Sequence, residues 1–262
     1  MPGSRVAVDK ARGAYLGQWA ALRTWVGLLP DADWSRASAV ASWSVGDLVA
    51  HLGLVADAVP VALAEPTGQR PMTVAEYLSA YPSAAASIDE RTRDAGRASR
   101  AEVLAGLDTS AGRAEAALSA VSAGSDLVLV ARRGPIRLSD LLVTRCIELT
   151  VHGDDLGRSI DRDDVPLRRP AMQLAVRSVA EVLAQRAPGH SVEVRVPPFA
   201  AVQCVAGPRH TRGTPPAVVE TDPVTFLRMA TGRVDWATAV AAGSVRLSGL
   251  RTDLSAYLPV LV

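Results

Sequence analysis

The chain has 262 residues, of which 48% are hydrophobic and 21% charged. This composition is typical of a soluble globular protein with one large or two ordinary domains. A formal net charge of +1 gives no excess positive charge for nucleic acid. We find no apolar run long enough to cross a bilayer and no apolar signal core near the start, and two cysteines are too few for a disulfide scaffold. We therefore expect a cytoplasmic protein that binds neither nucleic acid nor membrane.

The first half of the chain has helical periodicity. Tyr15, Trp19, Leu22 and Val26 follow helical spacing in a helix predicted from about residue 6 to 29. Three residue pairs have the spacing of a capping box and predict further helix starts: Ser44 with Asp47, Thr73 with Glu76, and Ser99 with Glu102. Residues 82–121 are predicted to be helical with a break near residue 99. A small β excursion is predicted within residues 125–138.

The second half of the chain has patterns of both strands and helices. Residues 158–170 are charged and contain two prolines, which predicts an interdomain linker. Strands are predicted at 190–196, 199–206, 217–221 and 244–248, and helices at 171–187, 222–229, 235–242 and 253–261. Helices beside a short antiparallel sheet indicate an α+β domain.

The helix predicted over residues 138–156 is apolar nearly all the way round, which is typical of a buried helix. It nevertheless carries Arg145, Glu148, His152 and Asp155, which fall within one stripe at 3.6 residues per turn. Glu148 and His152 are four residues apart and so are neighbours on one face. A buried carboxylate and imidazole are costly unless something satisfies them, and a metal ion would satisfy both.

A third candidate ligand is His51, which lies beside the predicted core stripe of the helix that begins near Ser44. Metal sites in helical bundles are made from side chains on facing helices, and catalytic zinc typically has three protein ligands. We therefore favour a metal site formed by His51, Glu148 and His152. The alternative is that His51 is a core histidine and that Glu148 and His152 form a structural hydrogen bond.

These segments resemble the mycothiol-dependent maleylpyruvate isomerase family, whose members belong to the DinB-like metal-binding bundles. The resemblance rests on Ser44-Val-Gly-Asp-Leu-Val-Ala-His51, on Glu148-Leu-Thr-Val-His-Gly-Asp-Asp-Leu156, and on tail segments similar to a sterol-carrier-like domain. It implies a two-domain protein, with an all-α DinB-like four-helix bundle over residues 1–165 and a small α+β sterol-carrier-like domain over residues 166–262. The resemblance assigns zinc to the same three ligands, His51, Glu148 and His152.

The resemblance also implies the chemistry. Zinc would deprotonate the thiol of mycothiol, which would add to an electrophilic small molecule. The outcome would be cis–trans isomerisation of a maleylpyruvate-like substrate, or S-transfer if the adduct persists. Lys10 is the only lysine among 28 basic residues, which suits the GC-rich actinobacteria that make mycothiol. We expect a monomer or small homo-oligomer.

Arginine suits carboxylate geometry, so three arginines are candidates for binding a dicarboxylate substrate. Arg145 lies on the stripe of the metal-site helix, and Arg212 and Arg233 lie in the tail segments. For each of them the alternative is a surface or structural ion pair. Cys146 faces away from the stripe, about 200° round the helix from Glu148, and is expected to be a buried, inert thiol.

Two other functions remain open at this point. The chain could be a binding protein that uses its sterol-carrier-like domain for a lipid or other small apolar ligand, with the bundle as a scaffold. Two histidines and one carboxylate can also hold iron(II) in an oxygenase. The identity of the metal distinguishes the oxygenase from the thiol-dependent enzyme.

Overall fold

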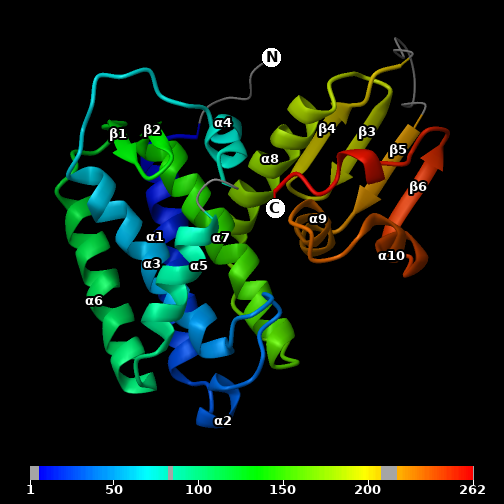
Figure 1. Cartoon of the computed structure of the whole chain (residues 1–262). Coiled ribbons are helices and arrows are strands. Elements are labelled where there is room, and N and C mark those ends of the chain that lie inside the picture. The colour runs from blue at the N-terminus through cyan, green and yellow to red at the C-terminus, as the bar shows by residue number, and fades with distance from the viewer. Residues whose placement is uncertain (1–5, 82–84, 208–216, 262) are drawn as a thin grey trace. The chain divides into compact units, whose positions relative to one another are not determined.

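The computed structural model of the chain describes residues 6–81, 85–207 and 217–261 (Figure 1). Contacts divide the chain into two compact units, with the boundary between Met172 and Gln173. This boundary lies inside helix α8 (Arg169–Arg186), a few residues after the point predicted from the sequence.

The N-terminal unit consists of helices and one hairpin. Its elements are α1 (Val8–Gly27), α2 (Asp31–Trp34), α3 (Val45–Leu63), α4 (Val74–Ser79), α5 (Ala85–Gly96), α6 (Arg100–Ser119), the antiparallel pair β1 (Val128–Ala131) and β2 (Gly134–Arg137), and α7 (Leu138–Ser159). The four longest helices form the bundle, because α3 packs against α6 and α7 while α1 packs against α7 and α6. The predicted helical bundle is thus confirmed, as is the β excursion before its last helix.

All three predicted capping boxes are present. Ser44, Thr73 and Ser99 each accept a hydrogen bond from the backbone N–H three residues on, and the acidic residue there accepts one from the backbone N–H of the cap. Each box satisfies two of the backbone donors that a helix start leaves unpaired. The box at Ser44 fixes the start of α3 and hence the position of His51, about two turns into that helix.

Helix α3 is the most apolar helix of the unit. Its mean hydropathy of 1.5 over 18 residues makes it long and apolar enough to cross a membrane, which the sequence analysis did not expect. However, 61% of that window is buried inside the protein. The predicted stripe of apolar residues, Val45, Leu48, Leu52, Val55 and Val59, is buried throughout. The helix therefore has the burial of a core helix.

The C-terminal unit is an α+β domain. Besides most of α8 it contains β3 (Val192–Val196), β4 (Ala200–Cys204), β5 (Ala217–Thr221), α9 (Pro223–Ala230), α10 (Trp236–Ala241), β6 (Val245–Gly249) and the short 3-10 helix η2 (Ser255–Tyr257). The strand order is β4-β3-β5-β6. Buried and half-buried residues alternate along β3, as its sequence pattern predicted.

The sheet is mixed, so the prediction of an antiparallel sheet was wrong. Strand β3 is antiparallel to β4 but parallel to β5, with Val194 opposite Val219. The reason is that β4 returns along one edge of β3 through a short connection, whereas β5 pairs with the opposite edge and runs in the direction of β3. A period of two in the sequence identifies a strand but not its direction.

The prediction of a helix over residues 253–261 was also wrong. Only η2 is helical in this stretch, and Leu258 is extended with φ of −114° and ψ of 144°. Leu258 precedes Pro259, and the proline ring disfavours the α conformation of the residue before it. The apolar pattern suited a helix, but the proline prevents one.

Candidate metal centre

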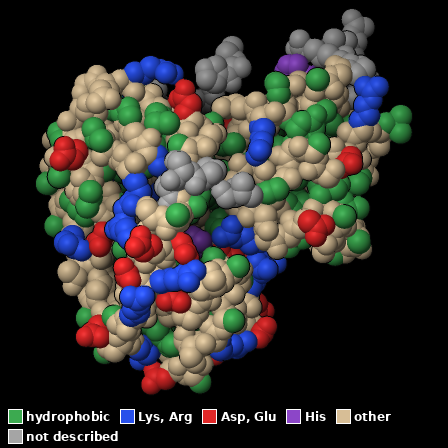
Figure 2. All heavy atoms as spheres, viewed as in Figure 1, with side chains coloured by type: hydrophobic (Ala, Val, Ile, Leu, Met, Phe, Trp, Pro, Cys, Tyr) green, Lys and Arg blue, Asp and Glu red, His purple; other side chains and the backbone are tan. Residues whose placement is uncertain are grey.

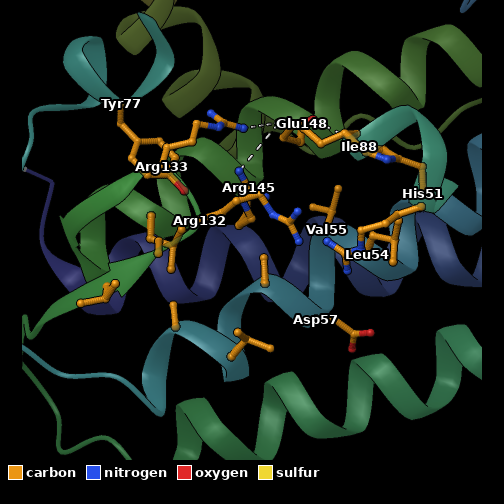
Figure 3. Close-up of a pocket in the computed structure, with 17 residues that line it drawn as sticks. His51, Leu54, Val55, Asp57, Tyr77, Ile88, Arg132, Arg133, Arg145 and Glu148 are labelled. Carbon is orange, nitrogen blue, oxygen red and sulfur yellow. Dashed lines mark ion pairs between the residues drawn. The ribbon is translucent and has the colours of Figure 1, made fainter. Parts of the chain in front are cut away.

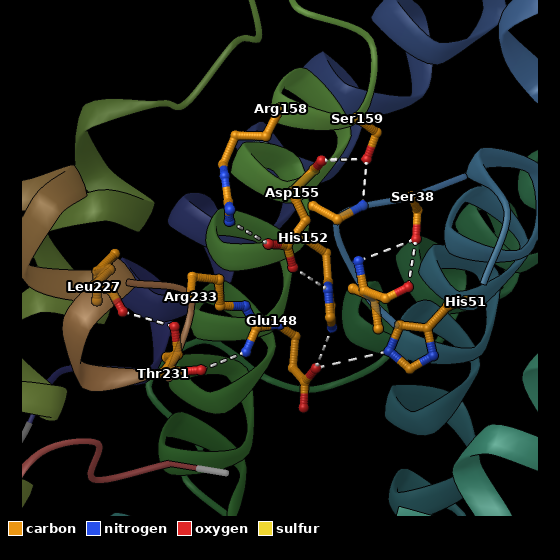
Figure 4. Close-up of polar contacts among 12 residues, drawn as sticks. Ser38, His51, Glu148, His152, Asp155, Arg158, Ser159, Leu227, Thr231 and Arg233 are labelled. Atoms are coloured by element: carbon orange, nitrogen blue, oxygen red, sulfur yellow. Dashed lines mark hydrogen bonds and ion pairs between the residues drawn. The ribbon is translucent and has the colours of Figure 1, made fainter. Parts of the chain in front are cut away.

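Two buried histidines and a largely buried glutamate from two helices meet in the N-terminal unit (Figure 4). Glu148 and His152 come from α7, and His51 faces them from α3. Glu148 Oε2 lies 3.7 Å from His51 Nε2 and 3.3 Å from His152 Nε2. The three residues offer ligand atoms that all lie within 4.8 Å of one another. The structure therefore brings together the three residues that the sequence analysis singled out.

The outer nitrogen of each imidazole has a partner of its own. His51 Nδ1 lies 3.1 Å from Thr92 Oγ1, and His152 Nδ1 lies 3.1 Å from Asp155 Oδ2. With Nδ1 donating its proton in each case, both Nε2 atoms point towards Glu148, and each would offer its lone pair to a metal ion once it carries no proton. Partners of this kind fix the tautomer and orientation of metal-binding histidines. Asp155 is fully buried and lies 3.6 Å from Arg158 Nη1.

The titration of the three groups follows from burial and from these partners. Burial, only partly offset by Glu148, lowers the pKa of His51. Burial also opposes the charged form of His152, but Asp155 and Glu148 outweigh it and raise the pKa of His152. The pKa of Glu148 lies well below its usual range in spite of burial, because both histidines and Arg145 stabilise the carboxylate. At neutral pH the triad therefore contains a carboxylate and a neutral His51.

This arrangement fits a divalent metal. Two bonds of about 2.1 Å at a tetrahedral angle place their donor atoms about 3.4 Å apart, close to the spacing of Glu148 Oε2 from the two histidines. His51 Nε2 is buried and has no hydrogen-bond partner among the described residues. A buried polar atom without a partner is costly, and a metal ion would satisfy it. Two imidazoles and one carboxylate are ligands typical of catalytic zinc.

The other oxygen of Glu148 faces arginines. Glu148 Oε1 lies 3.7 Å from Arg133 Nη2 and 3.7 Å from Arg145 Nη2. Both guanidinium groups are buried, with 5% and 8% of their side chains exposed. One carboxylate thus divides its two oxygens between the histidine pair and the arginine pair.

A cavity of about 260 Å³ adjoins this cluster (Figure 3). Its wall includes His51, Arg133, Arg145 and Glu148, together with apolar side chains of α3, α5 and α7. On the histidine side, the Trp43 ring lies 5.1 Å from the His51 ring and 6.4 Å from the His152 ring, measured between centroids. The candidate metal ligands therefore lie between an aromatic side chain and a cavity large enough for a small molecule.

The sequence matches two protein families. It matches the Mycothiol maleylpyruvate isomerase N-terminal domain over residues 15–157, which is more than half of the chain, and Bacterial SCP ortholog over residues 168–260. The chain belongs to the mycothiol maleylpyruvate isomerase N-terminal domain family. This confirms the resemblance inferred from the sequence and the expectation of an enzyme with a sterol-carrier-like tail. The matched range contains His51, Glu148 and His152.

Solved structures share the fold of this family member. A crystal structure of the mycothiol-dependent maleylpyruvate isomerase, in a variant with one histidine replaced by alanine, matches with a TM-score of 0.66 and 15% identity over 93% of each chain. A second crystal structure of the mycothiol-dependent maleylpyruvate isomerase matches with a TM-score of 0.62 and 14% identity, also over 93% of each chain. These likenesses confirm the two-domain fold. No curated protein matches the sequence significantly.

Of the three arginines predicted to bind substrate, one is seen in the cluster. Arg145 lies in the cluster, next to Glu148. Arg212 lies outside the described residues. Arg233 belongs to the C-terminal unit, where its Nη1 donates a hydrogen bond to the Thr231 carbonyl at 2.7 Å. Cys146 is buried and is not part of the cavity wall, in line with the expected inert thiol.

Arg133 was not predicted as a site residue from the sequence. This residue lies in the turn between β1 and β2, where sequence pattern does not indicate the direction of a side chain. The available signal was the Arg132–Arg133 pair next to Gly134, a few residues before the helix that carries Glu148.

Proposed function

We propose that this chain is a mycothiol-dependent isomerase that converts a maleylpyruvate-like cis dicarboxylate into its trans isomer, with a divalent metal held by His51, Glu148 and His152. Family membership over residues 15–157 supports the reaction class. The observation that carries the metal site is the buried Nε2 of His51, which faces a carboxylate and has no hydrogen-bond partner among the described residues. We propose zinc because this ligand set is common in catalytic zinc sites.

A zinc ion in this site would supply a thiolate at neutral pH by deprotonating the thiol of mycothiol. The chain's own residues would prepare the site. Thr92 and Asp155 hold the protons on the outer nitrogens, so that both histidines present their Nε2 lone pairs. Glu148 stays ionised because its neighbours keep its pKa low. Arg145 would bind a substrate carboxylate beside the reacting carbon, since its guanidinium is buried within the cavity wall.

Isomerisation requires the substrate to rotate about one bond while it stays bound. The cavity wall contains both charged and apolar side chains, which suits this requirement, because charged contacts can hold a carboxylate while apolar side chains contact a carbon chain without fixing its rotation. S-transfer is the alternative outcome. The two outcomes differ in the thiol balance, because isomerisation returns mycothiol unchanged, whereas S-transfer consumes one thiol per turnover.

The test of the metal site is elemental mass spectrometry of the purified protein alongside two variants. His152→Ala removes one proposed ligand. His190→Ala is the matched control, because His190 is an exposed histidine of the C-terminal unit whose Nδ1 lies 2.9 Å from Gln203 Oε1. We expect about one zinc per chain in the parent protein and in His190→Ala, and loss of zinc in His152→Ala. Zinc retained by His152→Ala would contradict the proposed ligand set, and iron in the parent protein would favour an oxygenase.

The test of the reaction follows maleylpyruvate and free thiol together. We expect isomerisation only when mycothiol is present, with the thiol concentration unchanged at the end and with activity lost in His152→Ala. Consumption of thiol in proportion to product would contradict isomerisation and would identify the reaction as S-transfer. A metal-loaded protein that neither isomerises nor transfers would support the alternative of a small-ligand-binding protein. Arg212 and Arg233 stay proposals for further carboxylate contacts, and the cytoplasmic location and the oligomeric state stay predictions.

A further inference from the structure

Arg133 is a buried cation held by two aromatic rings. It lies in the turn of the β1–β2 hairpin, and its guanidinium carbon lies 4.8 Å from the ring centroid of Tyr77 and 4.5 Å from that of Tyr81. Only 5% of its side chain is exposed. Rings at these distances attract a guanidinium and restrict its orientation. Burial lowers the pKa of Arg133, but an arginine stays protonated in any protein environment.

The hydrogen-bonding capacity of this guanidinium is largely unused. Its Nη2 lies 3.7 Å from Glu148 Oε1, which is longer than a hydrogen bond. Its Nε and Nη1 are buried and have no hydrogen-bond partner among the described residues. Buried arginines normally form bidentate bonds to a carboxylate or phosphate, because several donors left unpaired are costly. Arg133 therefore has donors left for an anion besides Glu148.

The cavity next to Arg133 has an excess of positive charge. Four arginines form part of its wall, whereas its only acidic lining residues among those described are Asp57 and Glu148. Asp57 already pairs with Arg113 at 2.7 Å. Glu148 Oε1 is shared by Arg133 and Arg145, and Glu148 Oε2 faces the two histidines. A metal ion at the histidines would leave the two buried arginines still less neutralised.

Apolar side chains also line this cavity. They include Leu54 and Val55 of α3 and Ile88 of α5 (Figure 3), and Leu141 of α7. A ligand that fits this cavity therefore has an anionic group for the arginines and a carbon chain with few polar atoms for the apolar side chains. A short unsaturated carboxylate meets both requirements.

We propose that Arg133 is a substrate-binding residue, which binds a carboxylate of the ligand in this cavity while Tyr77 and Tyr81 hold its guanidinium plane. This inference rests on the proposed function and deepens it, because it assigns the side chain that recognises the substrate anion. Arg145 would approach the same anion from α7. Selectivity for carboxylates then comes from a hairpin turn, outside the helices that carry the metal ligands.

The test is calorimetric binding of maleate to the 262-residue chain without any thiol, in both zinc-free and zinc-loaded protein. Arg133→Met removes the charge and keeps most of the stem. Arg97→Met is the matched control, because the Arg97 side chain is 80% exposed and pairs with Asp94 at the surface. We expect Arg133→Met to weaken maleate binding about 10- to 100-fold in both forms, the range for a lost charge-assisted bond. Arg97→Met should bind maleate like the parent protein.

Arg133→Lys keeps the protein testable if the methionine variant does not fold. It retains the charge but not the planar fork, so maleate should bind several-fold more weakly than to the parent. Unchanged maleate binding in folded Arg133→Met, or parent-like binding in Arg133→Lys, would overturn the inference. Neither measurement depends on turnover. Failure of isomerisation would therefore leave this result standing, whereas intact isomerisation with unchanged maleate binding would overturn the Arg133 assignment alone.

Discussion

His152 has an acidic partner on each side of its ring. Asp155 lies 3.1 Å from Nδ1 and Glu148 lies 3.3 Å from Nε2. These neighbours raise the pKa of His152 against the effect of burial. A metal ion would take the place of the proton at Nε2, while Asp155 keeps hold of the proton at Nδ1. Asp155 therefore acts on the proposed metal through the histidine.

Asp155→Asn tests this role. The amide keeps the size of the side chain but loses the charge that orients the ring and makes it a stronger base. We expect zinc affinity at pH 7, measured by competition with a chelating indicator, to fall about 10- to 100-fold. Asp154→Asn is the control, because Asp154 is the adjacent acidic residue of α7, whereas the two ring nitrogens of His152 face Asp155 and Glu148. An unchanged zinc affinity in Asp155→Asn would contradict the role given to Asp155.

The two cysteines give a prediction about pH. Burial raises the pKa of Cys146 to about 12 and that of Cys204 to about 11. Because both values lie far above neutral, the reactive thiolate is scarce in the native protein at pH 8. We expect iodoacetamide to leave both thiols unmodified in native protein and to alkylate both in denaturant. Rapid alkylation of Cys146 in the native state would contradict this expectation and would make Cys146 a candidate nucleophile.

At the scale of elements, local patterns predicted the helices that hold the candidate ligands. Helical spacing and capping boxes depend on residues three or four apart, so the starts of α3, α4 and α6 could be read directly. The stripe on α7 could likewise be read from its period. That α3 faces α7 depends on contacts between residues about 100 positions apart. It was inferred from the burial and chemistry of His51 and not from any local pattern.

The features that could not be predicted depend on tertiary structure or on single residues. Arg133 lies between Tyr77 and Tyr81, which come from a different part of the chain. No local spacing relates a hairpin turn to those rings. The direction of β5 relative to β3 depends on which edge of β3 it joins. The missing terminal helix was decided by one proline, against an apolar pattern that suited a helix.

The capping box of α3 can affect zinc binding in addition to stability, and two variants distinguish these effects. Ser44→Ala removes the side-chain acceptor at the start of the helix that carries His51, and Ser99→Ala removes the same kind of cap from α6, which carries no ligand. We expect each variant to lower the free energy of unfolding by about 1 kcal/mol, measured by urea titration of the zinc-free protein. Only Ser44→Ala should also weaken zinc binding. Equal zinc affinities in the two variants would show that the cap does not position His51.

At the scale of the whole molecule, all three candidate ligands lie within the N-terminal unit. The visible face of this unit carries basic and acidic side chains interspersed with one another (Figure 2). Surface ion pairs of this kind contribute little to stability. The stability of the unit therefore depends mainly on its apolar core and, with the proposed metal bound, on that metal.

Zinc should accordingly stabilise one unit directly. A ligand at 100 times its Kd adds about 2.7 kcal/mol to the free energy of unfolding when it binds only the native state. We expect hydrogen exchange with mass detection to show slower exchange in α3, α5 and α7 on addition of zinc, and no change in β3 to β6. In His152→Ala this protection should be absent. Protection confined to the C-terminal unit would place the metal somewhere other than the triad.

Glu148 directs one carboxylate oxygen to the histidines and the other to the arginines. Binding of a metal at the histidines and binding of a carboxylate at the arginines should therefore affect each other. A cation bound at Oε2 would neutralise part of the single negative charge that also interacts with Arg133 and Arg145 through Oε1. Metal binding would therefore strengthen the hold of the arginines on a carboxylate, and thermodynamic reciprocity requires the carboxylate to tighten metal binding by the same factor. A single side chain would in this way couple the loading of the metal to the arrival of substrate, without any movement of the bundle.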